Sequence, residues 1–436
     1  MNWFRLSSCR FSSRRSKILA LAIVVGAVFV LPRGWLYWQI SSARTALLKG
    51  KPAAAVERMA RAVAFAPNHA EAQYLLAVAL RRAGHLDQVS APLEAARKLG
   101  WSREDLELQS LLTLVQNGEI DTVDARLKAI MARGASDEAA EQIYEAYAIG
   151  YLKTYRLKEA WDCLNYWGTW QPKAIFPKFW RADICRRIDN AVAEEQEYRD
   201  ILAIDPHHLE SRVRLADVLK DSNRVQDAAR EYELSLAQDS SRPEILIGLA
   251  ECERRLGHVP RAVALLKQAM ELKLSATQRS TALTQSGQID ADEGNWRRAI
   301  EQLEEAVNLA PSEGSTLFAL SQAYSAAGEE LKSQEALTRS KLVKKHRDRI
   351  EEIARILVDR PASADLRFEA GKILMDLGMK EDGAAWLQTA LLMRPDHAAA
   401  LEALAQFERE KSAGTIDLPQ GPRNESKEST RMIQQK

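Results

Sequence analysis

GQIDADEGNWRRAIEQLEEAVNLAP, residues 287–311, is the stretch of sequence that decides the fold. Together with its flanks, from residue 280 to residue 313, it is predicted to form two short amphipathic helices folded back on each other. In the second helix Ala299, Leu303 and Ala306 follow one another at i, i+4 and i+7, a spacing that places them on one face. That face is expected to pack against the first helix.

Glycine and proline mark the limits of the two helices. Gly294 and Asn295 lie between them, where a tight turn needs residues that tolerate positive φ. Pro311 ends the second helix, because proline cannot continue a helix. Prolines recur along the chain in the same position, and their spacing fits a repeat of about 34 residues with extra residues at a few places. These prolines are Pro67, Pro172, Pro206, Pro311 and Pro395.

The recurring positions resemble those of the tetratricopeptide repeat, a helix-turn-helix unit of about 34 residues. In the stretch above they are Leu283, Gly287, Gly294, Ala299, Leu303, Ala306 and Pro311. Further copies are expected at residues 36–69, 70–103, 104–137, 141–174, 175–208, 209–242, 243–276, 314–347 and 364–397. The resemblance implies an all-α fold, a right-handed α-solenoid in which the first helix of each repeat lines a concave surface.

The repeats are expected to fill most of the chain. Residues 39–347 hold about nine copies, and residues 348–363 are predicted to be a helical insert that continues the helix before it. Residues 364–411 are predicted to form a final repeat and a capping helix, which a terminal repeat needs for solubility. The polar residues 412–436 are expected to be a disordered tail.

The N-terminus is predicted to anchor the chain in a membrane. Residues 1–17 are basic and contain no acidic residue, and residues 18–32 form an uninterrupted apolar run. This run alone is short for a membrane span, which needs about 20 residues. Counted from 18 to 38 the segment is long enough for a transmembrane signal anchor, with Arg33 reaching toward water and the aromatic residues after it at the membrane interface.

Orientation follows from the basic N-terminus, which tends to remain in the cytoplasm. We therefore expect a single-pass protein of the inner (cytoplasmic) membrane whose repeats lie in the periplasm. Two alternatives remain open at this point. The segment could be a cleaved signal peptide of a secreted protein, or a presequence that leads to the mitochondrial inner membrane.

The sequence contains no recognisable catalytic motif. It lacks a phosphate-binding loop, a nucleophile elbow and a zinc-protease motif, so we expect no enzyme and no cofactor. His69, His208 and His397 each stand two residues after a terminating proline, and the repeat explains them better than metal binding does. No metal ligand is therefore expected. The net charge of +1 gives no general attraction to nucleic acid, so no nucleic acid is expected as a partner.

Two cysteines lie close enough in the expected fold to raise the question of a disulfide, and one glutamate stands where the repeat normally has a small residue. Cys163 and Cys185 fall on neighbouring helices of adjacent copies, where buried free thiols are expected and a disulfide in an oxidising compartment is the alternative. Glu194 occupies a position that normally holds a small residue, so the copy at 175–208 is expected to be distorted.

Three arginine pairs stand at equivalent places near the end of a first helix. They are Arg81 and Arg82, Arg186 and Arg187, and Arg254 and Arg255. In tetratricopeptide arrays these positions face the groove, so the pairs are candidates for holding an acidic or C-terminal carboxylate segment of a partner. The alternative is that they only compensate the negative end of the helix dipole.

Aromatic residues supply the other candidates. Phe176 and Phe179 are predicted to project to groove-facing positions, and with the neighbouring arginines they have the composition of a binding hot spot. Tyr74 occupies in the second copy the position that Phe179 occupies in the fifth. The partner-binding hypothesis therefore rests on Tyr74, Phe176 and Phe179 together with the three arginine pairs.

These expectations lead to a membrane-anchored, non-enzymatic scaffold that binds proteins or peptides through its concave groove. Membrane-anchored relatives of the repeat family suggest a role in assembly of an envelope complex, which is an argument from fold alone. The first alternative is a polysaccharide- or lipid-binding module in envelope export, in which aromatic residues would stack on sugar. An enzyme that carries these repeats is the second.

Overall fold

The structure is a computed structural model that describes residues 33–414, and within them all regular structure is helical. The all-α prediction is confirmed for this part of the chain. Residues 1–17, the apolar run at 18–32 and the tail from 415 to 436 lie outside the described residues. Among the helices that are described, none is both long and apolar enough to cross a membrane.

The chain divides into two compact units, Met1–Gly150 (unit 1) and Tyr151–Lys436 (unit 2), a division that the sequence did not indicate. Unit 1 begins with a helix over residues 33–48, so the last residues of the predicted anchor form the first turns of a repeat helix. The helices that follow are α2 (Pro52–Phe65), α3 (Ala70–Arg82), the 3-10 turn η1 (Leu86–Gln88), α4 (Ser90–Lys98), α5 (Arg103–Asn117), α6 (Ile120–Ala132) and α7 (Asp137–Lys153).

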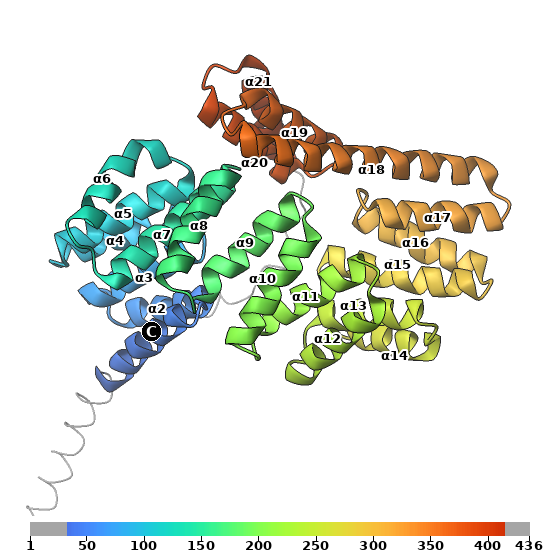
Figure 1. Ribbon diagram of the computed structural model, residues 1–436, viewed down its shortest axis with the longest axis horizontal. Coiled ribbons are helices and arrows are strands. Elements are labelled where there is room, and N and C mark those ends of the chain that lie inside the picture. The colour runs from blue at the N-terminus through green and yellow to red at the C-terminus, as the bar shows by residue number, and fades with distance from the viewer. Residues whose placement is uncertain (1–32, 415–436) are drawn as a thin grey trace, which may run out of the picture. The chain divides into compact units, whose positions relative to one another are not determined.

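Unit 2 contains the repeats from the fifth copy onward, together with the second helix of the fourth (Figure 1). Its helices are α8 (Leu157–Trp170), α9 (Ile175–Arg187), α10 (Ala191–Ile204), α11 (Leu209–Asp221), α12 (Val225–Gln238), α13 (Pro243–Arg255), α14 (Val259–Met270), α15 (Ala276–Asp292), α16 (Trp296–Leu309), α17 (Gly314–Ala326), α18 (Glu330–Asp359), α19 (Ala364–Asp376), α20 (Lys380–Met393) and α21 (Ala398–Gly414).

The pair α15 and α16 is the stretch from which the fold was predicted. Ala299, Leu303 and Ala306 are fully buried, as their spacing indicated. A Cβ on Gly287 would lie 2.8 Å from Cγ of Leu303, so glycine is needed for the two helices to approach this closely. Gly294 has a φ of +83°, the left-handed turn that was expected between them.

Helices α7 and α15 each have 17 residues, whereas most other first helices have 13. These two helices contribute to the longer proline intervals from Pro67 to Pro172 and from Pro206 to Pro311, because an added helical turn shifts the register. The larger excess between Pro311 and Pro395 lies in the second helix α18, so the extra residues lengthen helices instead of interrupting the array.

First helices lie side by side on one side of unit 2. α11, α13, α15 and α17 contact one another in succession, and each also packs against its own second helix. Contact between successive second helices is at most marginal in the described part of the chain. An array whose first helices are closer together than its second helices curves toward the first helices, which therefore line the concave side.

The long helix α18 connects the ninth repeat to the last one (Figure 1). Its 30 residues include the predicted insert at 348–363 up to Asp359, where Pro361 prevents further helix. The helix contacts α8 and α9 at the beginning of unit 2. The helices α19 and α20 that follow it therefore lie near the turn before α8. The capping helix α21 extends to Gly414, slightly beyond the predicted Lys411.

A closing contact joins the last repeat to the first turn of unit 2. The side chain of Arg367 on α19 is fully buried and donates hydrogen bonds to the backbone oxygens of Thr154, Tyr155 and Pro361. The ring of Tyr155 stacks on that of Trp386 on α20, with 3.6 Å between ring centroids. Residues more than 200 positions apart thus meet, and unit 2 is closed on itself.

Candidate partner-binding surface

The candidate surface consists of the first helices α11, α13 and α15 of unit 2 together with the preceding first helix α9, which is joined to α11 through α10; we call it the first-helix face. Phe176 and Phe179 lie on α9, and both are half-buried. Phe176 packs on Trp167 and Trp180, with 4.9 and 5.7 Å between ring centroids. Since these contacts lie within the unit, the two phenylalanines offer only part of their rings to a partner.

Phe179 is held in the same way by its own neighbours. Its ring makes edge contacts with Trp180, Tyr198 and His208, with centroids 6.1 to 6.3 Å apart. It also packs against the main hydrophobic core of unit 2. A substitution at Phe179 would therefore change stability as well as any binding.

Arg186 and Arg187 share one carboxylate. Asp183, one turn earlier on α9, lies 2.5 Å from the guanidinium of Arg186 and 2.6 Å from that of Arg187. Burial alone would raise the pKa of Asp183, but the two guanidiniums outweigh it and hold the pKa below its usual value. Two guanidiniums thus share one carboxylate, and a second carboxylate, that of Asp189, stands in the turn that follows α9.

The two arginines differ in what else they contact. The guanidinium of Arg187 lies over the ring of Tyr155, 5.1 Å from its centroid, and so belongs to the closing contact. The side chain of Arg186 is 55% exposed. Of the six predicted arginines, Arg186 therefore has the largest exposed surface with which to meet a partner.

Glu194 lies behind this end of α9, on α10. It is buried, and burial raises its pKa to about 7 although the nearby Arg186 opposes the shift. The helix α10 nevertheless runs without interruption from Ala191 to Ile204, so the predicted distortion of this repeat is not seen in its second helix. Partial protonation near neutral pH reduces the cost of placing an acidic residue at this position.

Arg254 and Arg255 on α13 pair with neighbouring repeats. Arg254 donates to Gln285 at 3.1 Å and lies 3.5 Å from Asp292. Arg255 donates to the backbone oxygen of Lys220 at 3.1 Å and to the side-chain oxygen of Asn223 at 2.6 Å. These arginines therefore connect adjacent first helices, and a partner would have to compete with contacts inside the unit.

Acidic residues of the first-helix face were missed by the sequence analysis. Glu251 accepts a hydrogen bond from Lys220 at 2.9 Å, and Asp217 accepts one from the hydroxyl of Tyr232 at 2.5 Å. These acids recur one helical turn before the basic residues, at the position of Asp183, and that repetition was the available signal. The face as a whole is close to neutral, unlike the basic ridge that the arginine pairs suggested.

In unit 1 the candidates Tyr74, Arg81 and Arg82 are also engaged internally. Arg81 is 1% exposed and donates to Gln109 at 2.9 Å and to Gln142 at 3.1 Å. Arg82 donates to Glu145 at 3.0 Å. Because Arg81 has almost no exposed surface, a partner could not touch it without opening the repeat.

Tyr74 stacks on Trp101, with 4.9 Å between ring centroids. Burial, followed by the charge of Asp105, raises the pKa of its hydroxyl to about 12. Tyr74 therefore packs between neighbouring repeats, and its surroundings are those of a hydrophobic core and not those of a solvent-exposed groove.

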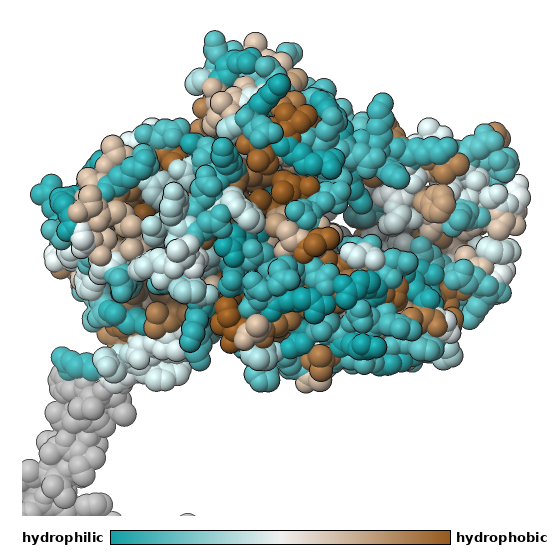
Figure 2. All heavy atoms as spheres, in the orientation of Figure 1, coloured by the Kyte–Doolittle hydropathy of each residue, from teal (hydrophilic) through white to brown (hydrophobic). Residues whose placement is uncertain are grey.

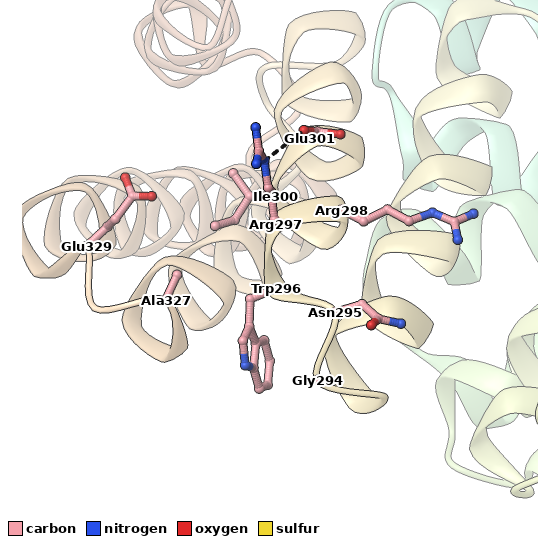
Figure 3. A pocket seen from close by; sticks show the side chains of 9 residues that line it. All are labelled: Gly294, Asn295, Trp296, Arg297, Arg298, Ile300, Glu301, Ala327 and Glu329. Carbon is pink, nitrogen blue, oxygen red and sulfur yellow. Dashed lines mark ion pairs between the residues drawn. The ribbon is translucent and has the colours of Figure 1, made fainter.

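An open hollow of about 810 Å³ lies where the turns of the eighth and ninth repeats meet. Its lining includes Trp296, Arg297, Arg298 and Glu329, whose side chains extend in different directions (Figure 3). Arg297 is 3.7 Å from Glu301, and Arg298 pairs with Asp290 at 3.2 Å. Polar groups thus do not converge on one point, as a specific small-molecule site requires.

Hydrophobic residues on the visible surface of unit 2 gather below α19 and α20 but are scattered over α10–α14 (Figure 2). Over α10–α14 the face in Figure 2 is mainly hydrophilic, with single hydrophobic residues between charged ones. Among residues 33–414, no three His, Cys, Asp or Glu side chains gather in a way that could hold a metal ion. Recognition on this face would therefore depend on single exposed charges beside partly buried rings.

The cysteines in the described residues are thiols. Cys185 and Cys252 are buried and free, so Cys185 does not pair with Cys163. Burial raises the pKa of Cys185 to about 11 and that of Cys163 to about 12. These thiols remain protonated and unreactive near neutral pH.

The family model described as Tetratricopeptide repeat matches residues 41–98 and 213–273. These two segments are tetratricopeptide repeats. The first covers the end of the helix at 33–48 with α2 to α4, and the second covers α11 to α14 and the start of the next link. The tetratricopeptide identity that was expected from the sequence is confirmed for both segments, one in each unit.

No curated protein matches the chain. Among solved structures, a tetratricopeptide repeat protein from Parabacteroides merdae is 15% identical and aligns over 66% of this chain and 99% of its own length, with a TM-score of 0.34. Yeast Tom70 is 9% identical, aligns over 93% and 100%, and has a TM-score of 0.33. MamA is 17% identical, aligns over 38% and 96%, and has a TM-score of 0.30. At these scores the likeness gives no guide to a ligand or partner.

Proposed function

We propose that the chain is a non-enzymatic scaffold that binds an extended segment of a partner protein across the first-helix face of unit 2. Tetratricopeptide repeats act by presenting a curved row of helices to a peptide or helix, and this general role supports the proposal. The observation that carries it is the exposed Arg186, which shares Asp183 with Arg187 and stands on the same helix as the half-buried Phe176 and Phe179.

The exposed guanidinium of Arg186 defines the partner segment. Its positive charge favours a segment with an acidic side chain or a C-terminal carboxylate, which a guanidinium can hold by two hydrogen bonds. The partly exposed phenylalanine rings favour an apolar side chain next to that carboxylate. Arg81, Arg82, Arg187, Arg254 and Arg255 are left out of the proposed contact, because their guanidiniums are engaged inside their units.

A photo-crosslinking amino acid at Asp221, an exposed residue at the end of α11, tests the proposal. The same amino acid at Arg230, an exposed residue of the second helix α12, is the control. We expect a defined adduct from position 221 in intact membranes and none from position 230. Arg186→Glu should remove the adduct and Arg186→Lys should retain part of it, and thermal unfolding of each variant separates this loss from the stability that Arg186→Glu removes beside Asp183. An undiminished adduct in the Arg186→Glu chain would refute the proposal.

We further propose that residues 18–38 anchor the scaffold in the inner membrane, with the N-terminus in the cytoplasm and the repeats in the periplasm, where it would serve assembly of an envelope complex. The basic residues 1–17 and the apolar run that follows support this arrangement. Protease digestion of spheroplasts tests the orientation. A C-terminal tag should be digested, and a tag that stays protected would contradict it.

A second candidate function is binding of an envelope polysaccharide, and α8 carries the observation that favours it. Tyr166 and Trp170 stand four residues apart on this helix and both are exposed, so their rings lie on one face. Rings exposed in this way can stack on sugar. A saturable change of tryptophan fluorescence on titration with an envelope glycan, lost in Trp170→Ala, would favour this function over peptide binding.

A further inference from the structure

Exposed aromatic residues gather at one end of the first repeat, which we call the aromatic end. Trp35, Tyr37 and Trp38 lie at the start of the helix over residues 33–48, and Phe65 is the last residue of α2. Their exposed fractions are 37%, 74%, 57% and 53%. These four are half of the exposed aromatic residues in the described part of the chain, although they fall within a single repeat.

Packing of the first repeat fixes the direction in which these rings point. Ile40, Ala43 and Leu47 on the helix over residues 33–48 are buried against α2 and α3. Because the two helices of a repeat are antiparallel, the start of the first lies beside the end of α2. The rings of Trp35 and Phe65 meet there, with 5.1 Å between centroids in an edge-to-face arrangement.

Basic side chains surround the same end. The guanidinium of Arg58 on α2 lies over the ring of Trp38, 5.5 Å from its centroid. Arg61 follows one turn later and is largely exposed, with Glu57 as its ion-pair partner. An arrangement of Trp and Tyr rings with arginines is favourable where an apolar phase meets anionic headgroups, because the ring is amphipathic and the guanidinium can reach phosphate.

The length of the preceding apolar run indicates what covers the aromatic end. A helix of residues 18–32 would span about 22 Å, roughly 8 Å less than the ~30 Å hydrocarbon core of a bilayer. About five or six further residues would supply the difference. The next six residues, 33–38, are helical and carry three of the four aromatic rings.

We propose that the aromatic end lies in the headgroup region of a lipid bilayer that contains anionic lipids. The proposal rests on the anchor at residues 18–38 and extends it. It adds Phe65 and Arg58 of α2 to the membrane contact, so the first repeat itself sits against the bilayer. Unit 1 is then held at a fixed distance from the membrane, in contrast to a domain on a flexible tether.

The test uses the full chain in vesicles of phosphatidylcholine and phosphatidylglycerol. A bimane fluorophore is attached at Phe65→Cys in one variant and at Lys128→Cys in another, both with Cys9→Ser. Lys128, on α6 of the same unit, has a 74% exposed side chain and serves as the matched control. Burial raises the pKa values of Cys163, Cys185 and Cys252, so near neutral pH the introduced exposed thiol should be labelled preferentially, and the unsubstituted chain with Cys9→Ser measures the background.

We expect nitroxide-labelled lipids to quench the fluorophore at position 65 at least ~3-fold more than at position 128, with iodide in water showing the reverse preference. If the chain does not float with the vesicles, the anchor and this proposal both fail. If it floats and positions 65 and 128 are quenched alike, the anchor stands and the membrane contact of the repeat is overturned. Protection of position 65 from iodide without quenching by lipid would mean that protein covers it, either a second copy or a partner, and would also overturn the proposal.

Discussion

Arg81 in unit 1 and Arg367 in unit 2 are both fully buried, and they are held by different groups. Arg81 donates to the side chains of Gln109 and Gln142, whereas Arg367 donates to three backbone carbonyl oxygens. Burial lowers the pKa of each to about 10, so both remain charged at neutral pH. A buried arginine can therefore connect neighbouring repeats, as Arg81 does, or hold together repeats that are far apart in the sequence, as Arg367 does.

The difference between the two arginines predicts unequal costs of removal. Gln109 also donates to Gln142 at 2.8 Å, so that pair survives the loss of Arg81. The carbonyls of Thr154 and Tyr155 stand in a turn, and Arg367 is the donor that reaches them from the last repeat. Unpaired buried carbonyls are expensive, whereas amide side chains can rearrange.

The largest effect is expected from Arg367→Met. Loss of the donor to three backbone oxygens, one in a buried and two in partly buried hydrogen bonds, should lower the free energy of unfolding of unit 2 by about 3–5 kcal/mol. Urea unfolding followed by tryptophan fluorescence measures it, with Arg360→Met, at an exposed position just after α18, as the control. Equal losses in the two variants would show that the closing contact contributes nothing.

Glu194→Gln comes next and extends the comparison to a buried acid. The pKa of Glu194 is raised to about 7, so the folded chain holds a proton that the unfolded chain releases near its ordinary value of 4.5. This contribution to stability is complete below about pH 4.5 and is lost as the pH rises through 7.

Between pH 5 and pH 8 the native chain should therefore lose up to about 3 kcal/mol relative to Glu194→Gln, because one pKa unit corresponds to about 1.4 kcal/mol. Urea unfolding of both chains across this range measures the difference. Parallel pH profiles would mean that Glu194 is charged in the folded state, contrary to the prediction.

A smaller effect is expected from Arg81→Met, a loss of about 1–2 kcal/mol in the stability of unit 1. The glutamine pair remains bonded when Arg81 is lost, whereas Arg367 has no such pair among its acceptors. Urea unfolding under the conditions used for Arg367→Met gives the direct comparison. A larger loss at Arg81 than at Arg367 would reverse the order proposed here.

The smallest effect concerns the turn residues. Tyr155 in the closing contact and Asp189 in the corresponding turn of the next repeat both have positive φ, of 51° and 58°. Asp189→Gly should stabilise unit 2 by about 0.5–1 kcal/mol, because glycine adopts this conformation without strain. Tyr155→Gly should destabilise it, since the stacking on Trp386 is lost. Thermal unfolding separates the two, and a change of the same sign would argue against a role for the ring.

The sequence predicted what depends on neighbours in the chain. The turn at Gly294, the burial of Leu303 and the continuation of a helix toward Pro361 all follow from local spacing and from the backbone limits of glycine and proline. The contact of Arg367 with Thr154 could not be predicted, because its 213-residue separation depends on the accumulated curvature of the repeats.

The candidate site was predicted less well than the fold. The sequence correctly placed Arg186 near the end of a first helix, but it does not indicate which of the predicted arginines remain exposed to solvent. Arg81 and Arg186 occupy equivalent positions, and one is buried while the other is 55% exposed. Their difference comes from the side chains of the following repeats, where Gln109 and Gln142 enclose Arg81.

The closing contact has a consequence for how unit 2 comes apart. In an open array the terminal repeat has a neighbour on one side only, so it exchanges and unfolds first. Here α19 and α20 contact α18 and α21 and also the turn before α8, so their release breaks interfaces on both sides. Amides of α19 should therefore exchange with deuterium at rates close to those of the middle repeats, and proteolysis within the described repeats of unit 2 should not begin in α19 or α20.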